Sequence, residues 1–324
     1  MVKLLKKLRT PTPVSLKRFA ETRNNILVMR EVGGLGDILM HRMMFEDFKR
    51  VMPDARITWG VPPDYLQAAA DHPFVDEVVD CRTVNPYDYI ISYNTTTACG
   101  RYEAKVAPLS DKHRSDIWAN HCGVILTRHN MHLKINPDAQ EWARSKLHAA
   151  GATGKTVLLS PLSAQQGKNL TVGQMREISA YLKAKGLFVF ATHTSPILEL
   201  QKIGVPTLWG MGIKHWMALV AAADYVVSVD TSTFHCAGGL GRPLTGIFTY
   251  IDGLTYSKYY PTAIIVQKHR LLDPSWDCGP CFNWHNCPKC PAQNPIKPCL
   301  TDISTAMLVD GIEIMLQNRM TTLA

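Results

Sequence analysis

The protein has 324 residues, of which 46% are hydrophobic and 19% are charged, and its formal net charge at pH 7 is +8. These proportions are typical of a folded globular protein and exclude an intrinsically disordered chain. The length suits two domains of ordinary size, and no segment approaches the ~20 consecutive apolar residues that a transmembrane helix needs.

The positive charge is concentrated near the N-terminus. Residues 1–30 contain eight Lys or Arg side chains and one Glu, whereas the rest of the chain contains 27 basic and 26 acidic side chains. The charge therefore indicates a basic tail over residues 1–23, which is either solvated or in peripheral contact with an anionic membrane or with nucleic acid. No continuous apolar segment follows these charges, so the tail is not a secretory signal. We expect a cytoplasmic protein, at most peripheral to the inner face of the membrane.

The first half of the chain alternates short apolar runs with helical patterns. These patterns predict strands over residues 26–30, 56–61, 75–79 and 87–93, and helices that end near residue 52 and span residues 64–70, 111–122 and 139–150. Strands separated by helices predict a parallel, doubly wound sheet. The histidine-rich stretch over residues 113–132 has no assigned role, and we expect surface histidines there.

A second alternating series follows. It predicts strands over residues 156–160, 187–191, 207–208, 226–229 and 244–248, and helices over residues 172–185, 196–203, 214–223 and 234–240. Two such series predict an α/β protein with two Rossmann-like domains and a cleft between them. The expected divisions are a basic tail at 1–23, an N-terminal domain at 24–150, a C-terminal domain at 151–300, and a C-terminal helix and tail at 301–324.

Two turns follow predicted strands in equivalent places. Residues 31–37 form a glycine-rich turn that ends in an aspartate, and residues 230–233 read Asp-Thr-Ser-Thr before a helix of small residues. Both turns lie at carboxyl ends of parallel strands, where ligands bind, so we expect them to face each other. Helix capping by Asp230 or Thr231 explains part of the second turn. Three successive hydroxyl residues exceed what one cap requires, which favours an anion site at the helix N-terminus.

These two segments resemble motifs of glycosyltransferase family 9, the ADP-heptose:lipopolysaccharide heptosyltransferases. The similar stretches are R-x-x-G-G-L-G-D at residues 30–37, D-T-S-T-x-H-x-x-G-G-L-G-R-P at residues 230–243, and the lead-in at residues 208–224. Thr233 departs from the family pattern, which has Gly there, and Gly238-Gly239 replaces an Ala pair. The resemblance implies the GT-B fold, with two parallel sheets facing across a cleft, the acceptor on the N-terminal domain and the nucleotide sugar on the C-terminal one.

The resemblance also implies roles for single residues. Asp37 is expected to be the general base for the acceptor hydroxyl, although the same residue suits an N-terminal helix cap. Lys168 resembles the family's phosphate-contacting lysine. His235 is expected to reach a phosphate or ribose, with a packed core histidine as the alternative. The residues expected to bind the donor and its phosphates are Gly34, Gly36, Lys168, Asp230, Thr231, Ser232, Thr233 and His235. Because the chain has no Asp-x-Asp motif, no catalytic metal is expected on the diphosphate.

Five of the nine cysteines lie in one loop, residues 273–299. Paired Cys-x2-Cys spacing lets four thiolates surround one tetrahedral ion, which predicts a structural Zn²⁺ bound by Cys278, Cys281, Cys287 and Cys290. Reduced thiols and an iron–sulfur or redox site are the alternatives. Disulfides are not expected without a secretion signal.

The predicted function is the transfer of a sugar from a nucleotide-diphosphate sugar, similar to ADP-heptose, to a hydroxyl acceptor such as a lipopolysaccharide-core glycan. One alternative is a glycosyltransferase that modifies nucleic acid bases. A second is a non-enzymatic zinc-ribbon protein that binds nucleic acid. Salt-dependent DNA binding that survives removal of residues 1–23 would favour the second alternative.

Overall fold

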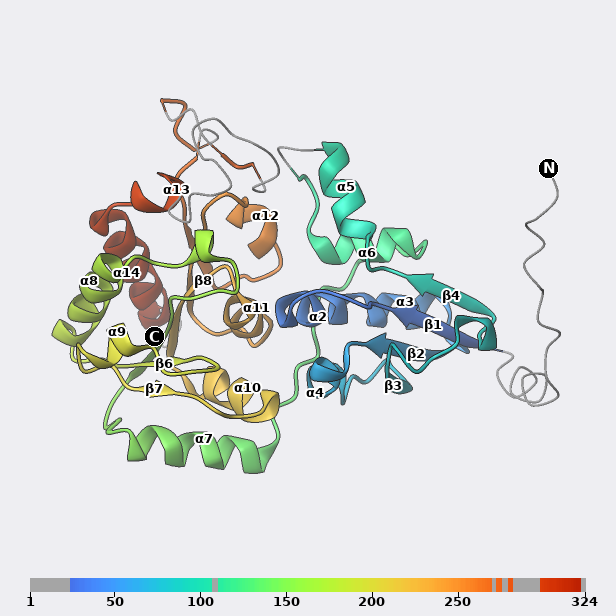
Figure 1. The fold of residues 1–324 in the computed structure, drawn as a ribbon, viewed down its shortest axis with the longest axis horizontal. Helices are drawn as coiled ribbons and strands as arrows, with labels where there is room; N and C mark the ends of the chain where they lie inside the picture. The colour runs from blue at the N-terminus through green and yellow to red at the C-terminus, as the bar shows by residue number, and fades with distance from the viewer. Residues whose placement is uncertain (1–23, 107–109, 270–271, 276–278, 282–297, 322–324) are drawn as a thin grey trace, which may run out of the picture.

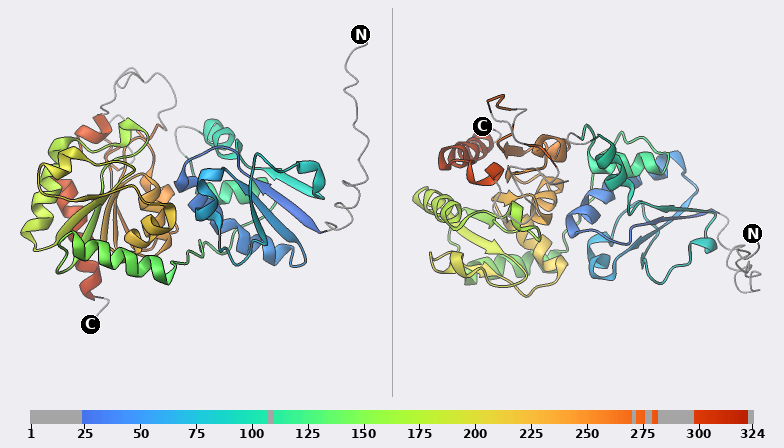
Figure 2. Two further views of the ribbon diagram at one scale, coloured as in Figure 1. Left: turned by 60° about the horizontal axis from the view of Figure 1, so that its bottom comes forward. Right: turned by 45° about the horizontal axis from the view of Figure 1, so that its top comes forward.

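The structure is a computed structural model that describes residues 24–106, 110–269, 272–275, 279–281 and 298–321. The described residues form two α/β units that lie side by side, each built on its own parallel sheet (Figure 1). In both views of Figure 2 the two sheets are separate. A single segment crosses from the first unit to the second and leads into a long helix. This arrangement confirms the predicted α/β fold with two parallel sheets.

The first sheet has four parallel strands in the order β3-β2-β1-β4. Apolar residues fill the centre: β1 is buried from Ile26 onward because strands pair with it on both sides. The strands are β1 (Asn25–Met29), β2 (Arg56–Val61), β3 (Glu77–Asp80) and β4 (Ile91–Asn94). The helical segments are α2 (Leu35–His41), η1 (Arg42–Met44), α3 (Phe45–Val51), η2 (Pro63–Tyr65), α4 (Leu66–Ala69), η3 (Pro86–Asp88), α5 (Ala98–Val106) and α6 (Arg114–His121).

The second sheet has six parallel strands in the order β10-β9-β8-β5-β6-β7. The strands are β5 (Thr156–Ser160), β6 (Phe188–Thr192), β7 (Thr207–Leu208), β8 (Tyr225–Val229), β9 (Leu244–Ile247) and β10 (Ala263–Val266). The helical segments are α7 (Pro137–Ala149), η4 (Gln166–Lys168), α8 (Val172–Ala184), α9 (Leu198–Gln201), α10 (Ile213–Ala222), α11 (Ser232–Gly239), α12 (Gly253–Ser257), α13 (Pro298–Thr301) and α14 (Thr305–Thr321).

The domain divisions remain predictions, but two helices bear on them. Helix α7, which the division at residue 150 assigns to the N-terminal domain, packs on α10, with the ring centroids of Trp142 and His215 4.4 Å apart. Helix α14 packs on β9 and β10. Both helices therefore pack within the second unit.

Two of the differences from the sequence expectations have a clear physical cause. The strand expected over residues 87–93 begins later, at Ile91, because a 3-10 turn starts at Pro86. The Asn85 side chain caps this turn by accepting a hydrogen bond from the N–H of Tyr87. The surface position expected for the histidines over residues 113–132 is wrong for His113. This side chain is fully buried, and its ring lies against Tyr259 of the second unit, with the ring centroids 5.1 Å apart.

Candidate active site

Strand order locates a crevice in each sheet. In the first sheet the chain continues from β1 to β2 on one side of β1, and β4 later pairs with β1 on its other side. In the second sheet the chain continues from β5 to β6 on one side of β5, and β8 later pairs with β5 on its other side. Such topological switch points open a crevice at the carboxyl ends of the strands, where ligands bind. Residues 30–37 follow β1, Lys168 follows β5, and Asp230 follows β8.

The two turns meet, as the sequence predicts. A Cβ atom added to Gly36, in the first turn of α2, would lie 2.9 Å from Cδ2 of His235 and 3.5 Å from Cα of Ser232, both in α11. Helices α2 and α11 thus touch across the boundary between the two units, and only glycine leaves room for the imidazole. The glycine-rich turn and the hydroxyl-rich turn therefore line one site.

Asp37 is held by two arginines. Its Oδ2 accepts a hydrogen bond from Nη2 of Arg30 at 2.9 Å, and its Oδ1 accepts one from Nη1 of Arg114 at 2.9 Å. The N–H of Gly34 donates to Oδ2 at 3.2 Å, so the carboxylate also caps α2. Burial raises the pKa of Asp37, but the two guanidinium groups and these hydrogen bonds outweigh it and lower the pKa to about 2.

Arg114 extends the network to a second carboxylate. Its Nε and Nη2 donate to the two carboxylate oxygens of Glu103 at 2.7 and 2.9 Å, which is the bidentate geometry of a strong pair. The hydroxyl of Tyr256, in α12 of the second unit, donates to Oε1 of Glu103 at 3.1 Å. The Arg114 guanidinium lies 5.3 Å from the centroid of the Tyr256 ring. Two cations and two anions thus form a cluster at the boundary between the units.

Lys168 and Asp230 form the corresponding pair on the second sheet. Nζ of Lys168 donates to Oδ2 of Asp230 at 2.7 Å, and Nε2 of His235 lies 3.7 Å from Oδ1. Burial raises the pKa of Asp230, yet the Lys168 ammonium and His235 outweigh it and hold that pKa well below its ordinary value. The lysine expected to bind phosphate therefore already neutralises a buried carboxylate at the switch point.

The remaining donor residues divide into two groups. Thr231 and Ser232 lie half-buried at the N-terminus of α11, and among the described residues the Thr231 side chain caps no helical N–H group. Thr233 is different: its side chain is buried and its hydroxyl accepts a hydrogen bond from Ser160 at 3.1 Å. The Thr233 side chain thus faces β5, and the expected role of Thr233 in donor binding stays a prediction.

His235 has the environment of a packed histidine. Its ring is buried, and Nδ1 forms a hydrogen bond with the hydroxyl of Tyr260 at 2.9 Å. Its Nε2 faces Asp230, and its Cδ2 faces Gly36. The imidazole thus connects the two turns.

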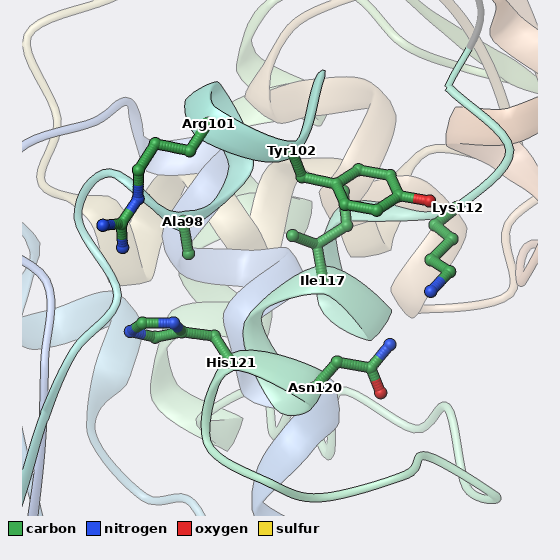
Figure 3. Close-up of a pocket in the computed structure, with 7 residues that line it drawn as sticks. All are labelled: Ala98, Arg101, Tyr102, Lys112, Ile117, Asn120 and His121. Carbon is green, nitrogen blue, oxygen red and sulfur yellow. The ribbon is translucent and has the colours of Figure 1, made fainter. Parts of the chain in front are cut away.

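A cavity of about 380 Å³ lies between α5 and α6 in the first unit (Figure 3). Ala98 and Ile117 form its apolar part and Tyr102 supplies an aromatic ring, whose hydroxyl donates to Asp111. Its polar lining consists of Arg101, Lys112, Asn120 and His121. The lining is therefore rich in basic side chains beside an aromatic surface.

Comparison with known proteins relates the second unit to a known family. Residues 127–282 match the model of glycosyltransferase family 9 (heptosyltransferase). This segment belongs to glycosyltransferase family 9. The match indicates a glycosyltransferase, and the matched segment contains α7 to β10, with Lys168, Asp230 and His235. A search of curated protein sequences finds no significant match.

Solved structures with the family 9 fold resemble the whole described arrangement. A glycosyl transferase family 9 structure from Veillonella parvula has a TM-score of 0.70 at 14% identity, covering 92% of this chain and 98% of that one. The E. coli ADP-heptose LPS heptosyltransferase II has a TM-score of 0.60 at 12% identity, covering 91% and 99%. The dodecameric iron-containing E. coli heptosyltransferase TibC, in complex with ADP-D-β-D-heptose, has a TM-score of 0.67 at 15% identity, covering 92% and 78%. These likenesses establish the GT-B fold.

The cysteine loop lies largely outside the described residues. Of the four predicted zinc ligands only Cys281 is described; its N–H donates to the carbonyl of Tyr250 at 2.9 Å, while Cys278, Cys287 and Cys290 lie outside. Within the described ranges no cluster of three or more His, Cys, Asp or Glu side chains is arranged to hold a metal ion. The zinc site therefore stays a prediction. The basic tail, residues 1–23, also lies outside the described residues.

Sequence reasoning missed Arg114, Glu103 and Tyr256. All three lie in segments without a recognised motif, and helix α5, which carries Glu103, was not predicted. A lone Glu and Arg eleven residues apart give no signal until two helices bring them together.

Proposed function

We propose that the protein transfers a sugar from a nucleotide-diphosphate sugar of the ADP-heptose type to a hydroxyl acceptor. One observation carries the proposal: the aspartate-ending glycine turn and the hydroxyl-rich helix N-terminus touch at the boundary of the two units, through Gly36 and His235. Similarity to heptosyltransferase II and to TibC, which is described in complex with ADP-D-β-D-heptose, supports this donor class.

In the proposed reaction Asp37 takes the proton of the acceptor hydroxyl as its oxygen attacks the anomeric carbon. The bond from that carbon to the diphosphate breaks, and the diphosphate leaves with the electron pair. Lys168 and the N–H and hydroxyl groups at Thr231 and Ser232 would neutralise the leaving group, as the positive end of a helix does for phosphates. The backbone of Gly34 and Gly36 would line the opposite side.

We propose that this reaction needs no metal on the diphosphate. The support is the sequence, which has no Asp-x-Asp motif, together with the cation and helix N-terminus at the second switch point. Full activity after exhaustive dialysis against EDTA is expected. Activity that is lost with EDTA and restored by Mg²⁺ or Mn²⁺ alone would contradict this part of the proposal.

The acceptor is proposed to bind the first unit, and a lipopolysaccharide-core glycan is the proposed class. The cavity between α5 and α6 supports this, because an aromatic ring beside Arg101, Lys112 and His121 suits a sugar that carries an acidic group. Nothing in the described residues favours a nucleic acid acceptor. Because the protein is a glycosyltransferase, the non-enzymatic zinc-ribbon alternative is withdrawn.

The deciding experiment is a donor screen followed by a transfer assay. ADP-heptose should raise the melting temperature more than UDP-glucose or GDP-mannose does, since a ligand that binds the folded state stabilises it by mass action. The same donor should release ADP in the presence of a lipopolysaccharide-core acceptor. Stabilisation by none of these nucleotide sugars, with no release of nucleotide, would overturn the proposal.

We also propose that Cys278, Cys281, Cys287 and Cys290 bind one structural Zn²⁺. The spacing of the two Cys-x2-Cys pairs supports this. Protein purified without added metal should contain close to one zinc per chain, and chelation should lower the melting temperature. Iron should be measured in the same samples, because TibC is described as iron-containing. Protein free of metal with an unchanged melting temperature would contradict the site.

We further propose that the protein is cytoplasmic and that the basic tail makes peripheral contact with the inner face of the membrane. Among the described helices, none is long and apolar enough to cross a membrane.

A further inference from the structure

Arg114 occupies an unusual position in the site. Three of its guanidinium nitrogens bind carboxylates: Nε and Nη2 bind Glu103, and Nη1 binds Asp37. The same guanidinium lies over the ring of Tyr256, which belongs to the other unit. It therefore connects the proposed base, an anchoring carboxylate and the boundary between the two units.

The contacts of Asp37 conflict with its proposed role. One carboxylate oxygen accepts hydrogen bonds from Arg30 and Gly34, and the other accepts one from Arg114, so the carboxylate is strongly stabilised as an anion before an acceptor hydroxyl binds. A carboxylate whose pKa is lowered to about 2 is also a weak base, and general bases work best with a pKa nearer the working pH. Release of one arginine from Asp37 would therefore raise its pKa and make it a stronger base.

The geometry distinguishes the two arginines. Arg30 is buried under Gly33, whose added Cβ would lie 2.6 Å from its Nη2, and its guanidinium lies 4.7 Å from the centroid of the Trp118 ring. The Arg30 side chain is 6% exposed, whereas that of Arg114 is 24% exposed. Arg114 also keeps a bidentate partner, Glu103, if it releases Asp37. Arg114 is therefore the one that can move.

We infer that Arg114 moves its Nη1 group from Asp37 to the diphosphate of the donor, with Nε and Nη2 remaining on Glu103. This inference rests on the proposed function. Oδ1 of Asp37 then loses its cationic partner, so it accepts the proton of the acceptor hydroxyl more readily. In the same step the diphosphate gains the negative charge that Asp37 loses, so the guanidinium follows the charge from the base to the leaving group.

The charges around Asp37 make this exchange measurable. Its titratable neighbours, taken from every element packed against the carboxylate, are Arg30, His41, Tyr65, Cys99, Glu103, Arg114, His235 and Tyr256. Burial lowers the pKa of His41 well below its ordinary value, and burial raises the pKa of Cys99 and Tyr256, so these three are neutral near pH 7. Removing Arg114 leaves Asp37 and Glu103 with a single arginine, Arg30, and should raise the pKa of Asp37 by about 1–3 units.

The test compares the acidic limbs of two pH profiles. The profile of kcat/KM reports the free enzyme, and the profile of kcat reports the enzyme with donor and acceptor bound. In the wild-type protein the acidic limb of kcat should lie at a higher pH than that of kcat/KM. In Arg114→Gln the two limbs should coincide, and the KM for the donor should rise about tenfold or more, because a charge-assisted contact is lost.

Controls separate this inference from its alternatives. Arg128→Gln, an exposed arginine after α6, should keep the wild-type profiles and donor KM. Arg114→Lys should restore part of the donor affinity but not the wild-type separation of the limbs, because an ammonium group cannot hold Glu103 with two nitrogens while it binds a third group. If Arg114→Gln does not fold, Glu103→Gln takes its place, and it should raise the donor KM because Arg114 loses its anchor.

Two failures are distinguishable. If the wild-type protein transfers no sugar from any nucleotide donor, the proposed function fails. If it is active but its two acidic limbs already coincide, or if Arg114→Gln keeps the wild-type separation and donor KM, only the role of Arg114 is overturned. A Glu103→Gln variant with the wild-type donor KM would overturn it as well.

Discussion

The two switch points hold their aspartates in different ways. Asp37, after β1, binds two guanidinium groups, one of which is shared with Glu103. Asp230, after β8, binds one ammonium group, from Lys168, and faces the imidazole of His235. Both carboxylates have a lowered pKa, but only at Asp37 can a cation leave while a second one remains.

This difference points to different roles for the two aspartates. Asp37 changes its charge during the reaction, whereas Asp230 fixes the position of Lys168. Asp37 has two cationic partners, so it can lose one guanidinium group while the other still balances its negative charge. Asp230 is almost fully buried, and a buried carboxylate that loses its cation is strongly destabilised. We therefore expect Asp230 to hold Lys168 in place for the diphosphate and Asp37 to take part in the chemistry.

The largest expected effect comes from removing the base. Asp37→Asn should lower turnover by roughly 10²–10⁴-fold, because an amide cannot accept the proton, with little change in the affinity for the donor. Steady-state assays with both substrates measure this. Asp54→Asn, at an exposed turn of the same unit, is the matched control and should be fully active. An Asp37→Asn protein with near wild-type turnover would remove Asp37 from the mechanism.

The second largest effect is expected at the switch point of the second sheet, where substitutions should lower the affinity for the nucleotide diphosphate. Lys168→Ala should weaken nucleotide-diphosphate binding by about 1–3 kcal/mol, and Thr231→Val by a smaller amount within the same range, because charge-assisted hydrogen bonds are the stronger ones. Isothermal titration with ADP measures both. Lys105→Ala, an exposed lysine in α5, serves as the control. Unchanged ADP affinity in both variants would place the diphosphate elsewhere.

The ion pairs of Asp37 with Arg30 and Arg114 should make the free energy of unfolding depend on pH in the acidic range. The folded-state pKa of about 2 lies below the ordinary value of 3.8, so the pairing contributes about 2 kcal/mol of unfolding free energy above pH 4 and loses it as the pH falls toward 2. Urea denaturation should therefore show a gap between wild type and Asp37→Asn at pH 7 that narrows at pH 3. A gap of the same size at both pH values would mean that the carboxylate charge is not its cause.

The smallest expected effect tests the contact between the two turns. Gly36→Ala places a methyl group against the His235 ring and should push the turns apart, lowering turnover by about tenfold, since small displacements of catalytic groups are costly. Gly154→Ala, where an added Cβ meets nothing within 4 Å, is the matched control. Equal activity of the two variants would show that the contact is not needed for catalysis.

The sequence by itself determined the alternation of strands and helices and therefore both parallel sheets. Strands such as β2 and β5 were predicted to the residue because a run of apolar residues between turn signals is a local property. The two turns at residues 30–37 and 230–233 were also predicted, with Asp37 and Asp230 in them. Parallel strands place their carboxyl ends at one edge, so pattern and topology together bring these turns to the ligand-binding side.

Only the tertiary structure decided which groups surround those turns. The pairing of Arg114 with Asp37 joins residues 77 positions apart, and the contact of Tyr256 with Glu103 joins residues 153 apart. The burial of His113 against Tyr259 and the inward position of Thr233 depend equally on packing between distant elements. Side-chain pairing across helices and between two units has no period in the chain, so no local pattern encodes it.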